Sequence, residues 1–201
     1  MKNSNRAQIR QKIRQQRLEL SKEQQNSAAL ALLKYFSTDS KIKHAQHIAL
    51  YLTNDGELDT QPLIDWCWQH NKNVYLPVIH PFAKGHLLFL KYTCDSPMIK
   101  NQYGIAEPKL DITAIILPMY LDVICTPLVA FDKEGNRLGM GGGFYDRTLS
   151  AWHQDFQTNR SAKPYPLGIA HDCQQVDLLP CEDWDIPLPE VLTPSQHHKF
   201  R

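Results

Sequence analysis

Hydrophobic and polar residues recur along the chain with two periods, one typical of helices and the other of strands. Residues 6–18 have the helical period, with Ile9 and Ile13 on one stripe and arginines on the neighbouring one. The spacing Ser-Lys-Glu-Gln at 21–24 is that of a capping box and predicts the start of a second helix. The residues of this helix that we expect to face a core are Ala28, Ala29, Leu32, Leu33 and Phe36.

Short apolar runs bounded by turn residues predict the strands of a sheet. We expect strands at 47–53, 74–79, 86–92, 122–126, 167–171 and 190–193. The run 86–92 is the candidate for an edge strand. Further helices are predicted over 60–70 and 144–152. Because strands and helices alternate, the pattern predicts one α/β domain over residues 1–201 with a mainly parallel sheet.

The composition of the chain argues against several classes of function. The chain has 201 residues and a formal net charge of +1, so it has no general attraction for nucleic acid or for a membrane surface. Its longest apolar stretch, 114–131, is interrupted by Pro118, Asp122 and Pro127 and is too broken to span a membrane. The five cysteines form no CxxC pair and are typical of reduced thiols, which predicts a cytoplasmic protein with no obligate protein partner. The Arg-rich start also resembles a transit peptide, although it contains few hydroxyl residues.

The segment 136–147, Asn-Arg-Leu-Gly-Met-Gly-Gly-Gly-Phe-Tyr-Asp-Arg, carries the most specific chemical signal. Its four glycines let backbone N–H groups approach a phosphate closely. A helix that begins at Phe144 would add free N–H groups and the positive end of its dipole. Arg137 supplies a fork of donors, and Asp146 supplies a hard oxygen for Mg²⁺. The segment lacks the Gly-Lys-Ser/Thr of a Walker A loop, and a plain surface loop remains the alternative.

Two charged patterns elsewhere could serve the same ligand. Arg6, Arg10 and Arg14 recur every four residues, so they share one helix face and could bracket a polyphosphate. A solvated helix face is the alternative for them. The acids Glu182, Asp183 and Asp185 lie in a proline-rich loop and could hold a cation together with Asp146, although spacing alone is weak support.

Residues 54–59, Asn-Asp-Gly-Glu-Leu-Asp, directly follow the first predicted strand. Ligands bind at the carboxyl ends of parallel strands, so Glu57 is well placed to touch one. Asp59 is assigned to the cap of the next helix. The histidine pairs 44/47 and 197/198 lack a third metal ligand at a sensible spacing, so we expect structural or exposed roles for them. The sequence contains no nucleophile motif.

Five motifs in order resemble the 5-formyltetrahydrofolate cyclo-ligase (5,10-methenyltetrahydrofolate synthetase) family, and they cover nearly the whole chain. They are Arg6-x-x-Ile-Arg10; Leu52 with Gly-Glu-Leu-Asp-Thr at 56–60; Tyr-Gly-Ile-Ala-Glu-Pro at 103–108; Pro-Leu-Val-Ala-Phe-Asp at 127–132 with the glycine segment up to Asp146; and Asp-Ile-Pro-Leu-Pro-Glu-Val at 185–191. The resemblance implies a Rossmann-like three-layer α/β/α fold, similar to that of sugar-phosphate isomerases and CoA transferases.

The resemblance also implies an activity and a set of site residues. The family uses ATP and Mg²⁺ to convert 5-formyltetrahydrofolate into 5,10-methenyltetrahydrofolate, and it releases ADP and phosphate. The residues implied for ATP are Arg6, Arg10, Arg137, Leu138, Gly139, Met140, Gly141, Gly142, Gly143, Phe144 and Tyr145. Those implied for the folate are Leu52, Glu57, Met140, Gly141, Gly142, Gly143 and Phe144. Asp146 and Asp185 would bind the metal, and Arg137 and Tyr145 are the candidate catalytic residues.

The chain departs from the family pattern at three positions. Some members carry Arg where this chain has Met140 and Lys where it has Gly142, and Tyr is common at the position of Phe144. Two alternatives stay open: a sugar-phosphate isomerase or CoA transferase-like enzyme on the same fold, and a non-catalytic binder of nucleotides or polyanions. For the metal assignment we expect Asp146→Ala to abolish turnover and to leave the fold intact.

Overall fold

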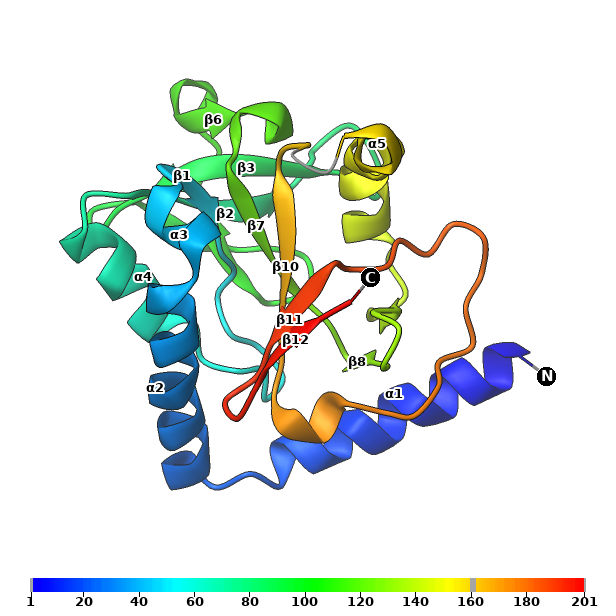
Figure 1. The fold of residues 1–201 in the computed structure, drawn as a ribbon. Coiled ribbons are helices and arrows are strands. Elements are labelled where there is room, and N and C mark those ends of the chain that lie inside the picture. Colours follow the sequence, from blue (N-terminus) through cyan, green and yellow to red (C-terminus); the bar gives the residue numbers. More distant parts are fainter. Residues whose placement is uncertain (1, 160–161, 201) are drawn as a thin grey trace.

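A large sheet forms the centre of the molecule in the computed structural model, which describes residues 2–159 and 162–200 (Figure 1). Its eight strands are β1 (His47–Ala49), β2 (Asn73–Ile79), β3 (Leu87–Tyr92), β6 (Ile115–Ile116), β7 (Val123–Pro127), β10 (Tyr165–Ile169), β11 (Glu190–Leu192) and β12 (His197–Lys199). They are arranged in the order β12-β11-β10-β7-β1-β2-β3-β6. The neighbours from β11 to β2 are all parallel, whereas β12, β3 and β6 pair antiparallel at the two ends. The predicted mainly parallel α/β sheet is confirmed.

Two strand predictions need correction. The run 47–53 forms a strand only as far as Ala49, because the chain then leaves the ladder toward a turn in which Asp55 and Gly56 have φ of 52° and 70°. The run 86–92 was predicted at an edge, and this is wrong. Strand β6 pairs with β3 through Phe89 and Leu90, so β3 is covered on both sides.

Helices cover both faces of the sheet. On one face lie α2 (Lys22–Thr38), α3 (Ser40–His44) and α4 (Gln61–Gln69), and on the other lies α5 (Phe144–Thr158). The capping box of α2 is present: Gln24 N donates to Ser21 Oγ at 3.2 Å and Ser21 N donates to Gln24 Oε1 at 2.8 Å. The predicted cap of α4 by Asp59 is wrong, because the N-cap residue is Thr60; Asp59 lies one position earlier and accepts from Gln61 N at 3.0 Å. Helix α5 runs six residues beyond its predicted end at Trp152.

Helix α1 (Lys2–Leu18) lies across the carboxyl ends of the central strands (Figure 1). Its buried Ile13 packs with Val129, Ala130 and Leu138, which follow β7. These residues lie in and beside a small hairpin, β8 (Ala130–Phe131) with β9 (Arg137–Leu138), and a second hairpin joins β4 (Met98–Lys100) to β5 (Ala106–Pro108). Short 3-10 helices complete the structure: η1 (Ile112–Ala114), η2 (Pro118–Tyr120) and η3 (Asp172–Gln174). The first helix is therefore held at the edge of the sheet where ligands of parallel α/β proteins bind.

Among the helices of the described residues, none is long and apolar enough to cross a bilayer. All five cysteines lie within the described ranges, and each of them is a free thiol.

Candidate functional site

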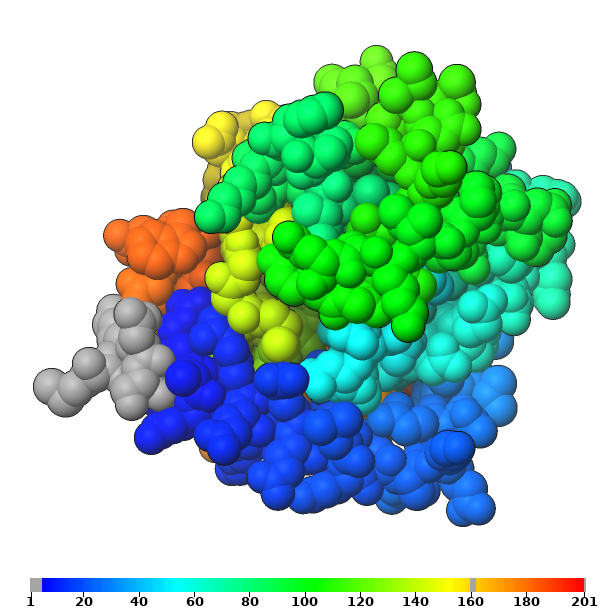
Figure 2. Space-filling view, turned by 180° about the vertical axis from the view of Figure 1, so that it is seen from behind, coloured from blue at the N-terminus to red at the C-terminus, as the bar shows by residue number. Residues whose placement is uncertain are grey.

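Two cavities meet at the glycine segment. One has a volume of about 490 Å³ and contains Leu52, Glu57 and Tyr145 in its wall. The other, of about 630 Å³, is lined by Arg6, Arg10 and residues of α5. In Figure 2 the yellow-green 140s lie between the first half of α1 (blue) and the hairpin of β4 and β5 (green). We call the first the inner cavity and the second the outer cavity; their shared wall consists of Gly139, Gly142, Gly143 and Asp146.

The backbone of the glycine segment explains why glycine is required there. Gly141 and Gly143 have φ of +99° and +64°, which other residues adopt only with strain. Gly143 is the N-cap residue of α5 and has no side chain to accept from the first turn. The first N–H groups of α5 therefore lack a side-chain cap and are available to an anion in the outer cavity. The predicted helix start at Phe144 is confirmed.

The arginines of α1 do not form a solvated face. Arg6 is 9 % exposed and donates to Asp185 through both terminal nitrogens, at 2.5 and 3.1 Å. Arg10 Nε donates to Gly139 O at 2.8 Å, which fixes the glycine segment to the helix. Arg14 instead donates to Asp55 at 2.6 Å, on the side of the inner cavity. The structure thus places Arg6 and Arg10 in the wall of the outer cavity, whereas Arg14 does not line it.

A second ion pair joins Arg137 to Asp146. The Arg137 side chain is 3 % exposed, and its Nη2 lies 2.6 Å from Asp146 Oδ1. Burial lowers the pKa of Arg137, and the nearby Asp146 carboxylate opposes this shift. A guanidinium remains protonated in proteins, so the pair is a genuine cation and anion. Arg137 Nε also donates to Ile186 O at 3.2 Å, which ties the glycine segment to the loop that carries Asp185.

The two predicted metal ligands differ in their availability. Asp146 Oδ1 is held by Arg137, but within the described residues Oδ2 accepts no hydrogen bond and the side chain is 22 % exposed. Both oxygens of Asp185 are engaged by Arg6. Burial alone would raise the pKa of Asp185, but the hydrogen bond from Arg6 and that from Glu182 N outweigh it and lower the pKa. The donor set fits Mg²⁺, with Asp146 as the freer ligand.

The inner cavity combines apolar walls with a buried acid. Burial raises the pKa of Glu57 to about 7, and the charge of Arg17 and a hydrogen bond from Asn54 N partly oppose this rise. Tyr145 has a pKa raised far above its ordinary value by burial and by the Glu57 charge. Its hydroxyl is therefore a donor and not a base. Among the described residues the Tyr145 hydroxyl has no hydrogen-bond partner in the protein, so it is free to bind a ligand.

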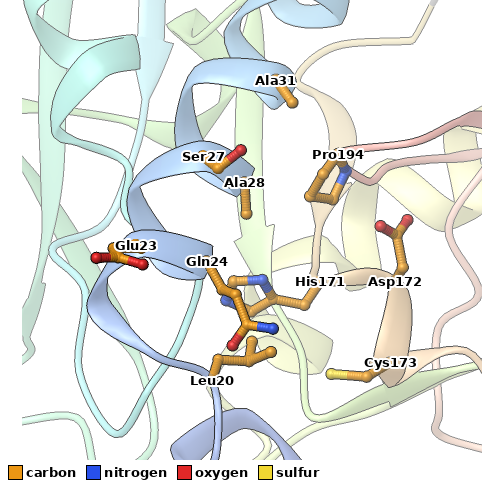
Figure 3. Close-up of a pocket in the computed structure, with 10 residues that line it drawn as sticks. All are labelled: Leu20, Glu23, Gln24, Ser27, Ala28, Ala31, His171, Asp172, Cys173 and Pro194. Atoms are coloured by element: carbon orange, nitrogen blue, oxygen red, sulfur yellow. The ribbon is translucent and has the colours of Figure 1, made fainter.

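Arg17 and His171 contact the turn that carries Glu57, and neither of them lines the inner cavity. Arg17 Nη2 donates to Asp55 O and to Asp55 Oδ2, at 2.9 Å each. His171 is 3 % exposed, and burial and the charge of Arg17 lower its pKa to about 4. Figure 3 shows His171 at the floor of a separate shallow hollow that faces α2. The sequence-predicted site residues do not line this hollow, so it is distinct from the two cavities.

Sequence reasoning missed Arg147. Its Nε donates to Gly85 O at 2.8 Å and its Nη2 donates to Gly142 O. It lines the outer cavity, where it supplies a positive charge that the chain lacks at Met140 and Gly142. A helical spacing of four from Gly143, at the predicted N-terminus of α5, was the signal that could have identified it. The β4–β5 hairpin also places Asn101 and Glu107 in the inner cavity; Glu107 lies in the motif at 103–108, whereas Asn101 had no signal in the sequence.

A three-residue group away from these cavities also has the composition of a metal site. The ligand atoms of Asp39, Glu190 and His197 lie within 4.8 Å of one another. Lys41 Nζ is 2.8 Å from Glu190 Oε1, and His197 Nε2 is 2.8 Å from Glu190 Oε2. Since a cation already neutralises Glu190, the group serves as an ion-pair cluster between α3 and the edge of the sheet. The expected structural role of His197 agrees with this arrangement.

Comparison with known proteins identifies the family. The sequence model of the 5-formyltetrahydrofolate cyclo-ligase family matches residues 2–194. The chain belongs to this family. A 5-formyltetrahydrofolate cyclo-ligase of Haemophilus influenzae is 50 % identical over 192 residues, which are 96 % of this chain and 99 % of that protein. The cyclo-ligase of Escherichia coli strain K12 is 51 % identical over 184 residues, 92 % of this chain and 97 % of the relative.

Solved structures of the same family share the fold. An NMR structure of 5,10-methenyltetrahydrofolate synthetase from Aquifex aeolicus superposes with a TM-score of 0.80 at 27 % identity, covering 98 % of this chain and 93 % of that one. A synthetase from Mycoplasma pneumoniae superposes with a TM-score of 0.70 at 21 % identity, covering 94 % and 98 %. The predicted family is therefore confirmed, and the isomerase, transferase and non-catalytic alternatives are not favoured.

Proposed function

We propose that the chain is a 5-formyltetrahydrofolate cyclo-ligase that uses ATP and Mg²⁺ and releases ADP and phosphate. The observation that carries the proposal is the wall shared by the two cavities, which lets one ligand in each cavity meet at the glycine segment. The outer cavity carries arginines and a helix N-terminus suited to a triphosphate. The inner cavity is mainly apolar with a buried acid and is suited to a pterin with polar edges.

The proposed reaction joins phosphoryl transfer to ring closure. The oxygen of the N5-formyl group attacks the γ-phosphorus of ATP, and the bond between that phosphorus and the oxygen of the leaving ADP breaks. The product of this step is an iminium phosphate. N10 then attacks the formyl carbon, phosphate leaves with the C–O electrons, and N10 loses its proton to give the methenyl bridge. The protein need supply no nucleophile, so its main tasks are positioning and charge stabilisation.

The residues have distinct proposed roles around the shared wall. Arg6, Arg10 and Arg137 would bind phosphate oxygens, together with the backbone of residues 138–145. Arg137 would stabilise the charge that develops on the transferred phosphoryl group, because it lies beside Asp146, the proposed ligand of the metal at the phosphates. Asp146 would hold Mg²⁺, which when bound would neutralise charge on the phosphates. Asp185 would be a second ligand once Arg6 turns from it to a phosphate. The Arg6–Asp185 pair would thus exchange partners, whereas Asp146 could keep Arg137 on Oδ1 and offer Oδ2 to the metal.

The folate would occupy the inner cavity. Glu57 would accept hydrogen bonds from the N–H groups of the pterin edge, and Leu52 would pack against the ring. Met140 to Phe144 would close the cavity toward the nucleotide. The Tyr145 hydroxyl would orient the formyl group, because the raised pKa keeps its proton in place for donation.

The test is a direct assay of product formation. The purified chain is mixed with 5-formyltetrahydrofolate, Mg²⁺ and ATP, and the near-ultraviolet absorbance of the conjugated methenyl product is followed against a control without ATP. We expect absorbance to grow only when ATP is present, with one ADP released per product. ATP hydrolysis at an unchanged rate without the folate would overturn the proposal.

A further inference from the structure

The outer cavity continues well beyond the segment that would hold phosphates. From Gly143 it follows one face of α5, which presents Arg147, Ser150 and His153. His153 lies ten positions after Gly143, which corresponds to about 15 Å of helix at 1.5 Å per residue. A triphosphate at the glycine segment therefore leaves space along α5 for the sugar and base of a nucleotide.

The far end of this cavity is walled by an exposed indole. Trp184 is 69 % exposed and lines the outer cavity together with His153 and Gln154. It makes no ring contact and no hydrogen bond with any residue in the described part of the chain. An exposed aromatic ring of this size in a cavity offers a large apolar face at little entropic cost to a ligand.

The turn that carries Trp184 is already ordered. Asp185 N donates to Glu182 O at 3.0 Å, and Glu182 N donates to Asp185 Oδ2 at 2.9 Å. Arg6 anchors the same carboxylate and also donates to Pro180 O at 3.2 Å. Figure 2 shows the orange 180s beside the first turns of α1. The backbone that carries Trp184 is thus held in position before any ligand arrives.

Charge along the cavity gives a nucleotide one orientation. Arg10 and Arg147 lie at the glycine segment, whereas Glu182 and Asp183 lie beside Trp184, and Asp185 next to them is already paired with Arg6. Carboxylates repel phosphates and accept hydrogen bonds from sugar hydroxyls and from an exocyclic amine. The triphosphate therefore binds at the glycine end and the base at the tryptophan end.

We propose that Trp184 is the stacking platform for the base of ATP, with His153 and Gln154 facing the nucleoside from α5. The inference rests on the proposed function, because it needs the nucleotide in the outer cavity. It adds a residue that decides affinity for the nucleoside and not for the phosphates. Base–aromatic stacking predicts about a tenfold loss of affinity for ATP when the indole is removed.

The experiment compares Trp184→Ala and Trp184→Phe with the unchanged chain by calorimetry, using Mg-ATP and Mg-tripolyphosphate as the two ligands. We expect Trp184→Ala to weaken ATP about tenfold, Trp184→Phe to weaken it about threefold or less, and both to bind tripolyphosphate normally. Tyr120→Ala, which removes an aromatic ring that is 64 % exposed in η2, is the matched control and should bind ATP normally.

Other outcomes separate the two proposals. Normal ATP affinity of Trp184→Ala overturns the stacking role and leaves the proposed function standing. An equal loss of ATP and tripolyphosphate also overturns it, because the residue would then act on the phosphates. If the unchanged chain binds neither ligand, the nucleotide site and with it the proposed function are wrong. Quenching of indole fluorescence by ATP that disappears in Trp184→Phe would support stacking directly.

Discussion

Glu57 and His171 lie on opposite sides of the turn at Gly56, and burial shifts their pKa values in opposite senses. The pKa of Glu57 rises to about 7, so between pH 4.5 and 7 the folded state holds a proton that the unfolded state has lost. The pKa of His171 falls to about 4, so between pH 4 and 6.5 the unfolded state holds the extra proton. Stability rises with pH where the unfolded state binds more protons, so the two contributions oppose each other.

The two variants Glu57→Gln and His171→Gln should therefore reveal opposite slopes. Without Glu57, we expect the free energy of unfolding to rise by about 1 kcal/mol per unit from pH 4.5 to 6.5 relative to the unchanged chain. Without His171, it should fall by about the same amount over this window. Urea denaturation at four pH values gives both slopes. Parallel pH profiles for the two variants would contradict the assigned shifts.

Asp146 has a structural task besides its proposed metal role, which changes what its replacement should do. Asp146→Ala leaves the buried Arg137 without its carboxylate, so we expect a loss of stability of about 3 kcal/mol. The expectation that this variant keeps its fold stays a prediction, now with a lower free energy of unfolding. Asp146→Asn retains the acceptor oxygen for Arg137 and should lose much less stability, while turnover falls about a hundredfold or more. Denaturant unfolding and the absorbance assay separate the two effects; normal turnover of Asp146→Asn would remove the metal assignment.

At the scale of the element, α1 is attached to the molecule mainly by its arginines. Arg6 and Arg10 contact the outer cavity, and Arg14 and Arg17 contact the turn of the inner one. Ile9 and Ile13 add the apolar contact with the β8–β9 hairpin. One helix therefore positions residues of both proposed ligand sites.

Asp55→Ala tests the attachment of α1 to the inner cavity. Arg17 has a side chain that is 1 % exposed, and Asp55 is its carboxylate partner. Removing Asp55 leaves a buried guanidinium without a counter-charge, and we expect a loss of about 3 kcal/mol in the free energy of unfolding. Asp177→Ala removes the exposed pair with Lys133 and should have no measurable effect. Equal losses in thermal or urea unfolding would show that the Arg17 pair is no stronger than a surface pair.

The elements that the sequence predicted well are those with strong local signals. The capping box at Ser21 and the apolar stripe of α2 were sufficient for that helix, and the glycine segment was sufficient for the start of α5. The sequence could not show where β1 ends, because Leu50 and Tyr51 are as buried as strand residues although they lie outside the ladder. It could not show that β6 covers β3, since that pairing involves only two residues that lie far along the chain.

At the scale of the whole molecule, the shared wall predicts coupling between the ligands. Gly139, Gly142 and Gly143 border both cavities, so a nucleotide that orders them removes part of the cost of binding the folate. We expect a non-hydrolysable ATP analogue to tighten 5-formyltetrahydrofolate binding about five- to tenfold, and the folate to tighten the analogue by the same factor. Titration of each ligand in the presence of the other measures both. Independent binding in the two titrations would refute the coupling.

Most of the candidate site could be named from the sequence because its residues fall in five ordered motifs. The ion pairs between these residues could not be predicted from the sequence. Nothing in the spacing indicates that Arg6 binds Asp185, which is 179 positions away, or that Arg137 is paired with Asp146 inside the same segment. Such contacts depend on how the sheet brings distant loops to one edge, which local patterns do not encode.

The contact of Arg6 with Pro180 and Asp185 also has a consequence for the order in which the molecule is made. Helix α1 leaves the ribosome well before the partners of Arg6, which are 174 and 179 residues later in the chain. A growing chain can fold α2 against its first strands long before those partners exist. The outer cavity can therefore close only after the 180s have been made, and a chain that stops before residue 180 lacks the wall formed by the 180s, whatever part of the sheet it has built.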